Sequence, residues 1–381
     1  MKTLKWFAYI ILFIIVALNA IILVSGRFYL YKGIANTYLK GRSGPGIDEA
    51  GMFANRLIKT GKPQPWSIAK NYNKASIPAE YLNQIVNYQT EAFVIIKNDS
   101  LCYEQYWDGY SDTSHTNSFS MAKSIVSILA GIAIQEGKIK SIDEHVYDFI
   151  PAFKTGMDSL LTIKDLLTMS SGMSYEESYV NPFAYPAEAY YGDDILAATL
   201  KYKVVTEPGK NFVYQSGNSA LLGYIVTLAT GEKLSDYASE KLWQPLGAEQ
   251  PAYWSLDHQG GMEKAYCCFN SNARDFARIG QLYLDSGKWG GQQLVPQNYV
   301  LASIKPALSD HYGYNWWILT FNGHLIPYCR GILGQYVFVI PERNMVVVRL
   351  GKKRGPVSNN VPMDAFVYLK AALDMYPEIK K

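Results

Sequence analysis

The 381-residue sequence lacks several features that would assign it to a class at once. It has four cysteines, and their spacing fits neither a zinc site nor a dense disulfide scaffold. Cys267 and Cys268 are adjacent, which is more typical of two small buried residues, although one disulfide in the chain stays open. The net charge is only +3, and the lysines and arginines form no basic stripe. Nucleic acid is therefore not an expected partner.

The motifs of several enzyme classes are missing as well. The sequence has no Gly-x-Ser-x-Gly elbow, which argues against α/β-hydrolase chemistry. It has no His-Glu-x-x-His pair and no phosphate-binding Gly-Lys-Ser/Thr loop. The five histidines are scattered: His115, His145, His258, His311 and His324. We therefore expect no metal and no cofactor.

One long apolar run is present, at the N-terminus. Trp6 to Val24 carries no charge and is broken only by Asn19. Its length matches a membrane-spanning helix and exceeds the usual apolar core of a secretory signal. Residues 1–27 are therefore predicted to be an uncleaved anchor, with cleavage after Gly26 as the alternative. Positive charges lie on both sides of the run and do not settle its orientation.

Patterning along the rest of the chain predicts an α+β fold. Residues 28–86 are rich in Gly, Pro, Asn and Lys, which favours a leader or linker before a body at 87–381. β-rich runs predict one hairpin near each end of that body, with helices between them. The hairpins are predicted at 92–107 and 336–351, and the helices at 120–137, 161–173, 211–231 (after a strand-like entry), 272–287 and 362–376. This order favours an antiparallel sheet built from both chain ends, flanked by helices, with a mostly helical insert.

The stretch "SFSMAKSIVSILAG" places a lysine at the head of an otherwise apolar helix. Ser120 and Lys123 are three residues apart, so their side chains share one helix face. Lysine is seldom buried without a partner. A buried lysine with a lowered pKa can take the proton of a serine hydroxyl, and the positive end of the helix favours negative charge at Ser120. The alternative is a capping serine beside a lysine that extends to solvent.

The Ser-x-x-Lys pattern alone is weak, because a second copy exists at Ser67 and Lys70. No apolar helix follows that copy, so we set it aside. Ser-Lys catalysis also needs a proton relay, for which the sequence offers Tyr179 and Tyr214. Tyr214 lies at the junction that enters a helix, whereas Tyr179 lies in an acidic, aromatic loop at 175–194. That loop either lines the pocket or is an ordinary surface loop.

Three segments in this order resemble the serine β-lactamase-like and penicillin-binding-protein-like superfamily. They are "SMAK", "PGKNFVYQSGNSALLGYI" and "RGILGQYVFVIPERNMVVV". Together with "YGYNWW" at 312–317, they resemble the class C-type branch, which includes family VIII esterases and 6-aminohexanoate-dimer hydrolases. The resemblance covers about residues 92–376 and implies the fold of that superfamily.

The resemblance also implies a role for each matching residue. Ser120 is implied to be the acylated nucleophile, Lys123 its base and Tyr214 the proton relay to the leaving group. The backbone N–H groups of Ser120 and Ile332 are implied to form the oxyanion hole. The implied substrate contacts are Ser216, Asn218 and Gly331, with Ser216 favoured over Asn218.

The third motif departs from the family pattern. A lysine or histidine normally begins it, but here the segment is Cys329-Arg330-Gly331. Without that lysine, the carboxylate of a β-lactam or a peptide terminus loses its partner. The sequence therefore favours a membrane-anchored, extracytoplasmic serine hydrolase of small esters or amides. The alternatives are a β-lactamase or DD-peptidase, a non-catalytic penicillin-recognition domain, and a membrane-tethered structural domain.

Overall fold

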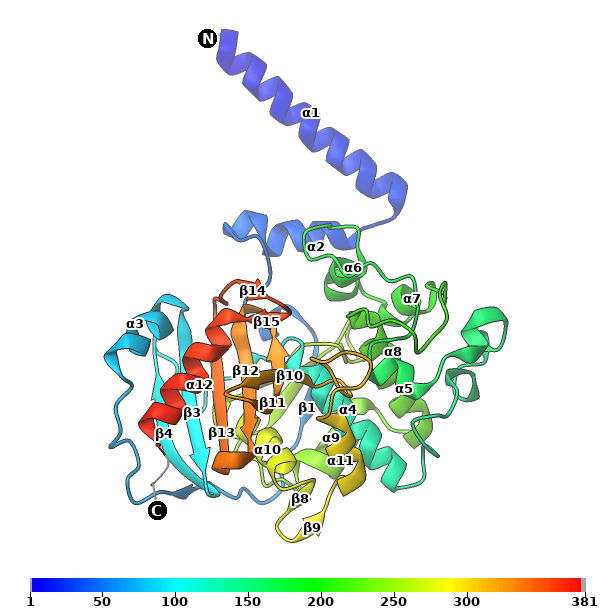
Figure 1. Cartoon of the computed structure of the whole chain (residues 1–381). Coiled ribbons are helices and arrows are strands. Elements are labelled where there is room, and N and C mark those ends of the chain that lie inside the picture. The colour runs from blue at the N-terminus through cyan, green and yellow to red at the C-terminus, as the bar shows by residue number, and fades with distance from the viewer. Residues whose placement is uncertain (1, 378–381) are drawn as a thin grey trace.

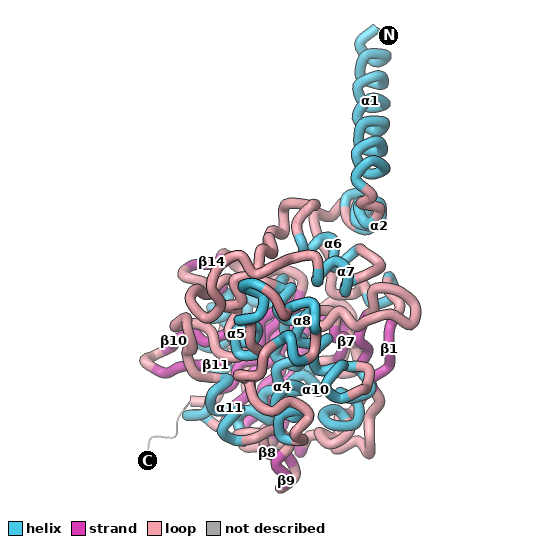
Figure 2. Tube along the Cα trace, turned by 90° about the vertical axis from the view of Figure 1, so that its right-hand side faces the viewer, coloured by secondary structure: helices cyan, strands magenta, loops and turns pink. Residues whose placement is uncertain are grey.

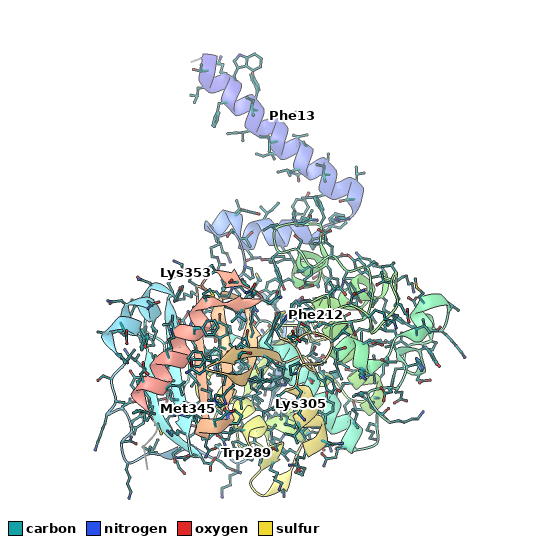
Figure 3. All side chains as sticks on the ribbon, viewed as in Figure 1. Phe13, Phe212, Trp289, Lys305, Met345 and Lys353 are labelled. Carbon is teal, nitrogen blue, oxygen red and sulfur yellow. A yellow bond between two sulfur atoms is a disulfide. The ribbon has the colours of Figure 1, made fainter. Side chains whose placement is uncertain are left out.

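The computed structural model describes residues 2–377, and its N-terminal helix projects away from the body (Figure 1). Helix α1 (Lys2–Ser25) is the one helix of the described chain that is long and apolar enough to cross a membrane. Its apolar side chains, such as Phe13, point into open space along most of its length (Figure 3). At 1.5 Å per residue, 23 residues reach about 35 Å, which is enough for a bilayer core. A signal sequence would pass the same test of length and composition.

A seven-stranded sheet joins the two ends of the chain, as the sequence predicted. The strand order is β10-β11-β12-β13-β3-β4-β2, and neighbours are antiparallel except for the short β2–β4 pair. The strands are β2 (Ser67–Ile68), β3 (Thr90–Lys97), β4 (Ser100–Tyr106), β10 (Trp317–Phe321), β11 (His324–Gly331), β12 (Gln335–Ile340) and β13 (Met345–Gly351). Both predicted hairpins, β3–β4 and β12–β13, are therefore confirmed.

The sheet separates two apolar cores. Along β3, Phe93 and Ile95 enter one core, and Val94 and Ile96 enter the other, because successive side chains of a strand point to opposite faces. The first core lies under α3 (Ala79–Asn87) and α12 (Met363–Met375). The second lies under α10 (Ala273–Leu284) and α4 (Met121–Gln135). A sheet buried on both faces gives the rigid frame that a site at its edge needs.

The segment predicted to be a leader is built into the body. Its strand β1 (Asn55–Ile58) joins a second sheet of order β1-β6-β7-β5, and its strand β2 joins the large sheet. The predicted boundary between residues 86 and 87 falls inside α3, and the domain division itself stays a prediction. The other strands of this second sheet are β6 (Ala252–Ser255), which pairs with β1, then β7 (Phe269–Ser271) and β5 (Thr116–Asn117).

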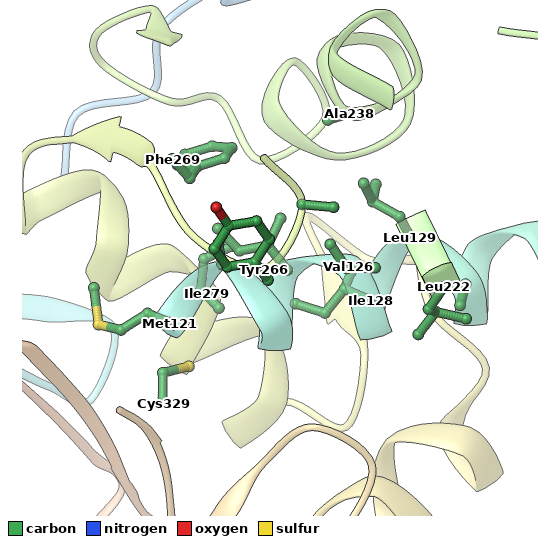
Figure 4. Close-up of a cluster of buried hydrophobic side chains, with 14 of the residues drawn as sticks. Met121, Val126, Ile128, Leu129, Leu222, Ala238, Tyr266, Phe269, Ile279 and Cys329 are labelled. Atoms are coloured by element: carbon green, nitrogen blue, oxygen red, sulfur yellow. The ribbon is translucent and has the colours of Figure 1, made fainter. Parts of the chain in front are cut away.

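The insert between β4 and β10 is mostly helical and surrounds α4 (Figure 2). Met121, Val126 and Leu129 of α4 belong to one buried cluster with Leu222 of α8 (Ser216–Thr230) (Figure 4). The strand-like entry predicted before α8 was wrong, because residues 211–215 are extended but form no ladder. The remaining helices are α2 (Tyr29–Asn36), α5 (Ile163–Leu167), α6 (Tyr185–Tyr191), α7 (Ile195–Leu200), α8 (Ser216–Thr230), α9 (Leu234–Ala238) and α11 (Gln297–Ser303), and the short hairpins are β8–β9 (Lys288–Trp289, Gln292–Gln293) and β14–β15 (Val357–Ser358, Val361–Pro362).

Candidate active site

Ser120 stands on a tight turn immediately before α4. Phe119 has a left-handed backbone (φ 46°), which is unusual for a bulky residue, and its side chain is buried. The Asn117 side-chain oxygen accepts a hydrogen bond of 2.8 Å from the Phe119 N–H and holds this turn. Ser120 remains partly exposed while the next residues of α4 are buried. The turn therefore presents one hydroxyl to solvent at the head of a buried helix.

Lys123 is buried directly beneath that hydroxyl. Only 1% of the residue is exposed, and its Nζ lies 3.0 Å from Ser120 Oγ, 3.2 Å from Ser216 Oγ and 2.8 Å from the Tyr266 carbonyl oxygen. Burial lowers the pKa of Lys123 to about 8, although the nearby Glu177 carboxylate acts to raise it. At pH 7 roughly a tenth of the amine is therefore neutral and able to accept a proton, far more than for an ordinary exposed lysine.

Glu177 fixes the direction of the hydrogen bonds around Lys123. The Ser216 hydroxyl donates to Glu177 Oε1 at 2.6 Å, and the Ser216 N–H donates to Oε2 at 2.7 Å. With its proton committed to Glu177, Ser216 can only accept from Lys123, and the Tyr266 carbonyl can only accept as well. When Lys123 is neutral, its lone pair is therefore left to face Ser120. In this arrangement a neutral Lys123 can accept a proton from Ser120.

Tyr214 lies beside the same pair. Lys123 Nζ is 5.2 Å from the centre of the Tyr214 ring, and the ring packs against Trp317. Burial raises the pKa of Tyr214, whereas its hydrogen-bonding contact with the Ser120 hydroxyl and the charges of Arg330 and Arg354 act to lower it. Tyr214 therefore keeps its proton at neutral pH and can donate it at the Ser120 side of the site.

The end of β11 approaches the Ser120 turn closely. A Cβ at Gly331 would lie 2.2 Å from the Ser118 carbonyl oxygen, so only glycine fits there. The last pair of the β10–β11 ladder is Trp317–Tyr328, which leaves the β11 edge beyond Tyr328 open on that side. Among the described residues, the hydrogen bonds of the structure include none from the N–H groups of Ser120 or Ile332. Both groups are thus available to an oxygen bound at this edge.

Three other sequence-predicted positions lie differently. The Asn218 side chain is fully buried and accepts from Ser171 Oγ at 2.7 Å, so the structure does not bring it to the Ser120 hydroxyl. Cys329 is buried in the core beneath α4, where burial raises the pKa of its thiol to about 12. Arg330 lies over the Trp317 ring at 4.3 Å and donates to the Asn360 carbonyl oxygen. The charge of Arg330 acts to lower the pKa of Tyr214, and Arg330 does not take the place of the lysine that normally begins the family's third motif.

The sequence interpretation missed two groups that act on Lys123: the Glu177 carboxylate, through its charge and its hydrogen bonds to Ser216, and the Tyr266 carbonyl oxygen, through a direct hydrogen bond. Glu177 belongs to the acidic loop whose role had stayed open, and its charge was the one hint in the sequence. The Tyr266 carbonyl is a backbone group and leaves no signature in the sequence. The next two residues, Cys267 and Cys268, are buried and joined by a disulfide, which is the bridge that the sequence left open.

Comparison with known proteins identifies the family to which the chain belongs. The family model described as Beta-lactamase matches residues 82–372. The 6-aminohexanoate-dimer hydrolase of Paenarthrobacter ureafaciens is 26% identical over 298 residues, covering 70% of this chain and 74% of that protein. Among solved structures, a Bacillus anthracis protein provisionally named 6-aminohexanoate-dimer hydrolase superposes with a TM-score of 0.72 at 23% identity, covering 86% of this chain and 92% of the other.

A family VIII carboxylesterase superposes with a TM-score of 0.61 at 15% identity, covering 82% of this chain and 99% of the other. At these identities the two structures show a shared fold. The family match spans the Ser120 turn, α8 and the end of β11, which are the elements that meet at the site. The chain therefore belongs to the Beta-lactamase family and is a serine hydrolase.

Proposed function

We propose that this protein hydrolyses a small ester or amide through an acyl-enzyme on Ser120. The observation that carries the proposal is the buried Lys123 amine, 3.0 Å from Ser120 Oγ and with a pKa lowered to about 8. A serine hydroxyl becomes a useful nucleophile only when a base of suitable pKa takes its proton in the right geometry. Lys123 meets both requirements.

In the acylation step, Ser120 Oγ attacks the substrate carbonyl carbon while its proton passes to Lys123. The resulting oxyanion accepts hydrogen bonds from the Ser120 and Ile332 N–H groups. Each such donor can lower the barrier by about 3 kcal/mol. Ser216 and Tyr266 hold the new ammonium through the contacts they already make.

Collapse of the intermediate requires a proton on the leaving oxygen or nitrogen. Tyr214 supplies it and is reprotonated from the Lys123 ammonium. Water then attacks the acyl-enzyme by the same steps in reverse, which releases the acid and restores Ser120. Gly331 leaves room for the substrate backbone or chain beside β11.

The charges in the site favour a substrate without a carboxylate near the scissile bond. Glu177 sits on Ser216 within the site, and the position of the family's third-motif lysine holds the buried Cys329. A β-lactam or peptide carboxylate would meet the Glu177 charge without the usual lysine to offset it. The DD-peptidase and β-lactamase alternatives are therefore less well supported than a small ester or amide.

The cellular location of the protein is inferred from helix α1. We infer that α1 anchors the chain in a membrane, with the catalytic body on the extracytoplasmic side. The length and apolar composition of α1 support an anchor, and a cleaved signal is the other interpretation of the same helix.

A fluorophosphonate probe tests the proposal on the detergent-solubilised full chain. Intact mass should show one adduct on the wild type, none on Ser120→Ala, and one on Ser67→Ala, whose serine belongs to the second Ser-x-x-Lys copy and is exposed. An adduct that survives in Ser120→Ala would refute the assignment of the nucleophile. No adduct on folded wild type, with a small probe as well as a large one, would favour the non-catalytic binding domain.

A further inference from the structure

Helix α1 passes into α2 through a fixed turn. Gly26 adopts a left-handed backbone (φ 66°), and the Arg27 N–H donates to the Ile22 carbonyl oxygen at 3.2 Å. The Tyr31 hydroxyl donates back to Asn19 Oδ1 at 2.8 Å, which ties α2 to the amide side chain that interrupts the apolar run. The end of α1 therefore determines where α2 lies.

Helix α2 is in turn fastened to the acidic loop that precedes α6. The Arg27 guanidinium lies 4.9 Å from the centre of the Phe183 ring, and the Tyr29 hydroxyl donates to the Pro182 carbonyl oxygen at 3.1 Å. Both views show α2 beside α6, at the end of the body from which α1 projects (Figures 1 and 2). The loop thus begins its contact with the α1–α2 junction at Pro182 and Phe183.

The same loop reaches the active site only a few residues earlier. Glu177 bonds Ser216, which contacts Lys123. Pro182 lies five positions after Glu177, and a fully extended chain of five residues spans at most about 18 Å. The catalytic centre and the end of the apolar helix are therefore held at opposite ends of one short loop.

Apolar side chains are exposed along this loop and around α2. Val180 in this loop is 92% exposed, although exposing an apolar side chain to water is unfavourable. We call this set the apolar rim, and it comprises Phe28, Tyr38, Leu39, Tyr179, Val180 and Phe183, each of them exposed. Exposed aromatic and aliphatic side chains on neighbouring elements mark an interaction surface, and aromatic residues are typical of the membrane–water boundary.

We propose that the apolar rim lies in the headgroup region of the bilayer that holds α1, and that the Ser120 site takes an amphiphilic ester or amide directly from that bilayer. The occupant is the bilayer rather than a second protein, because the rim begins within three residues of the point where α1 ends. The proposal rests on the hydrolase function and the anchor proposed above. It adds the substrate class: a molecule with an apolar chain that partitions into lipid.

Single-cysteine labelling tests the position of the rim. Cys102 and Cys329 are buried and the other two cysteines are joined, so an introduced thiol is the one a maleimide dye reaches. We would label Val180→Cys and the control Gln292→Cys in the full chain, reconstituted in phosphatidylcholine vesicles. Gln292 lies on the β8–β9 hairpin, at the end of the body away from α1 (Figures 1 and 2).

A nitrobenzoxadiazole dye should be blue-shifted at residue 180 and quenched by headgroup spin-labelled lipid, whereas the dye at residue 292 should be neither. Equal, unshifted emission at both positions would overturn the membrane contact. This readout needs no catalysis, so it decides the surface even if the hydrolase proposal fails.

The substrate class is tested by a ratio of two activities of the same sample. Turnover of a long-chain ester embedded in the vesicles is divided by turnover of a short-chain, water-soluble ester. Val180→Asp should lower this ratio roughly tenfold, because a charge replaces a side chain that gains from burial in lipid, and Gln292→Asp should not change it. Soluble-ester activity with an unchanged ratio would refute the lipid-borne substrate while leaving the hydrolase intact. If the wild type hydrolysed neither ester and formed no fluorophosphonate adduct, the hydrolase proposal itself would be refuted.

Discussion

Two lysines of the described chain are buried, and they differ in what surrounds them. Lys123 lies in the candidate site, and Lys264 lies near the N-terminal segment. Burial lowers the pKa of Lys123 to about 8 and that of Lys264 to about 7. The lysine outside the site therefore carries the larger shift of pKa.

Their partners separate them. The Lys123 amine contacts two hydroxyls and one carbonyl, whereas the Lys264 amine donates to the Ala189 carbonyl oxygen at 3.1 Å and lies 4.9 Å from the Phe53 ring. A carbonyl and a phenyl ring have no proton to give. Lys264 can therefore become neutral, but no neighbouring group can give it a proton. Lys123, in contrast, faces the partly exposed Ser120 hydroxyl, which can give one. A lowered pKa makes a base only where a proton donor faces it.

The largest expected effect comes from exchanging each lysine for methionine, which keeps most of the side-chain volume. Lys123→Met should lower kcat/KM for a soluble ester by about 10³-fold, because the general base is lost. Lys264→Met should stay within about threefold of wild type. Thermal unfolding of both variants controls for folding. A comparable loss in a folded Lys264→Met would show that the comparison of partners is wrong.

The next effect concerns the aromatic ring beside each lysine. Tyr214 stands 5.2 Å from Lys123, and Phe53 occupies the corresponding place at Lys264. Tyr214→Phe should cost about 10²-fold in kcat for an ester or amide with a poor leaving group, because the donated proton is lost. The cost should be smaller with a nitrophenol leaving group, which needs no proton. Phe53→Tyr serves as the matched control, and an equal loss with both leaving groups would contradict the relay role.

The elements that local pattern determines could be predicted from the sequence. Alternating β-rich runs gave both hairpins, and the lysine in an apolar helix singled out Ser120 and Lys123 before any contact was visible. The order of the motifs was enough to assign Gly331 to the site. The physical reason for a glycine there is the close approach of the Ser118 backbone, which is brought near only when the chain folds.

Features that depend on distant partners could not be predicted. Strand β1 pairs with β6, about 200 residues away, so its composition alone suggested a linker. Glu177 acts through Ser216, on another element, and a single acidic residue in an acidic loop carries no motif. Asn218 shows the converse: motif position suggested a substrate contact, but the packing of α8 turns its side chain toward Ser171.

The smallest effect concerns the pH dependence of kcat/KM, which separates the two lysines by the pKa of the catalytic base and leaves Lys123 in place. Lys123 must be neutral to accept the Ser120 proton, so kcat/KM should rise with pH through about 8, the pKa of the free enzyme's base. If Lys264 were the base, the rise would instead be centred near 7. A pH profile of Lys264→Met that matches wild type would assign the limb to Lys123.

Glu177→Gln sharpens this assignment, because the Glu177 carboxylate stabilises the Lys123 ammonium and so raises its pKa. Removing that charge lowers the pKa of Lys123, and the rising limb of kcat/KM should move to lower pH. Glu207→Gln, at an exposed glutamate paired with Lys210, should leave the limb in place. A limb that stays fixed in Glu177→Gln would mean that the titrating base is not the amine beside Ser216. If the rising limb moves in Glu177→Gln but not in Glu207→Gln, the base is Lys123, whose amine contacts the Ser120 and Ser216 hydroxyls. Glu177 is not among the charges that shift the pKa of Lys264, and the Lys264 amine donates to a carbonyl rather than to a serine.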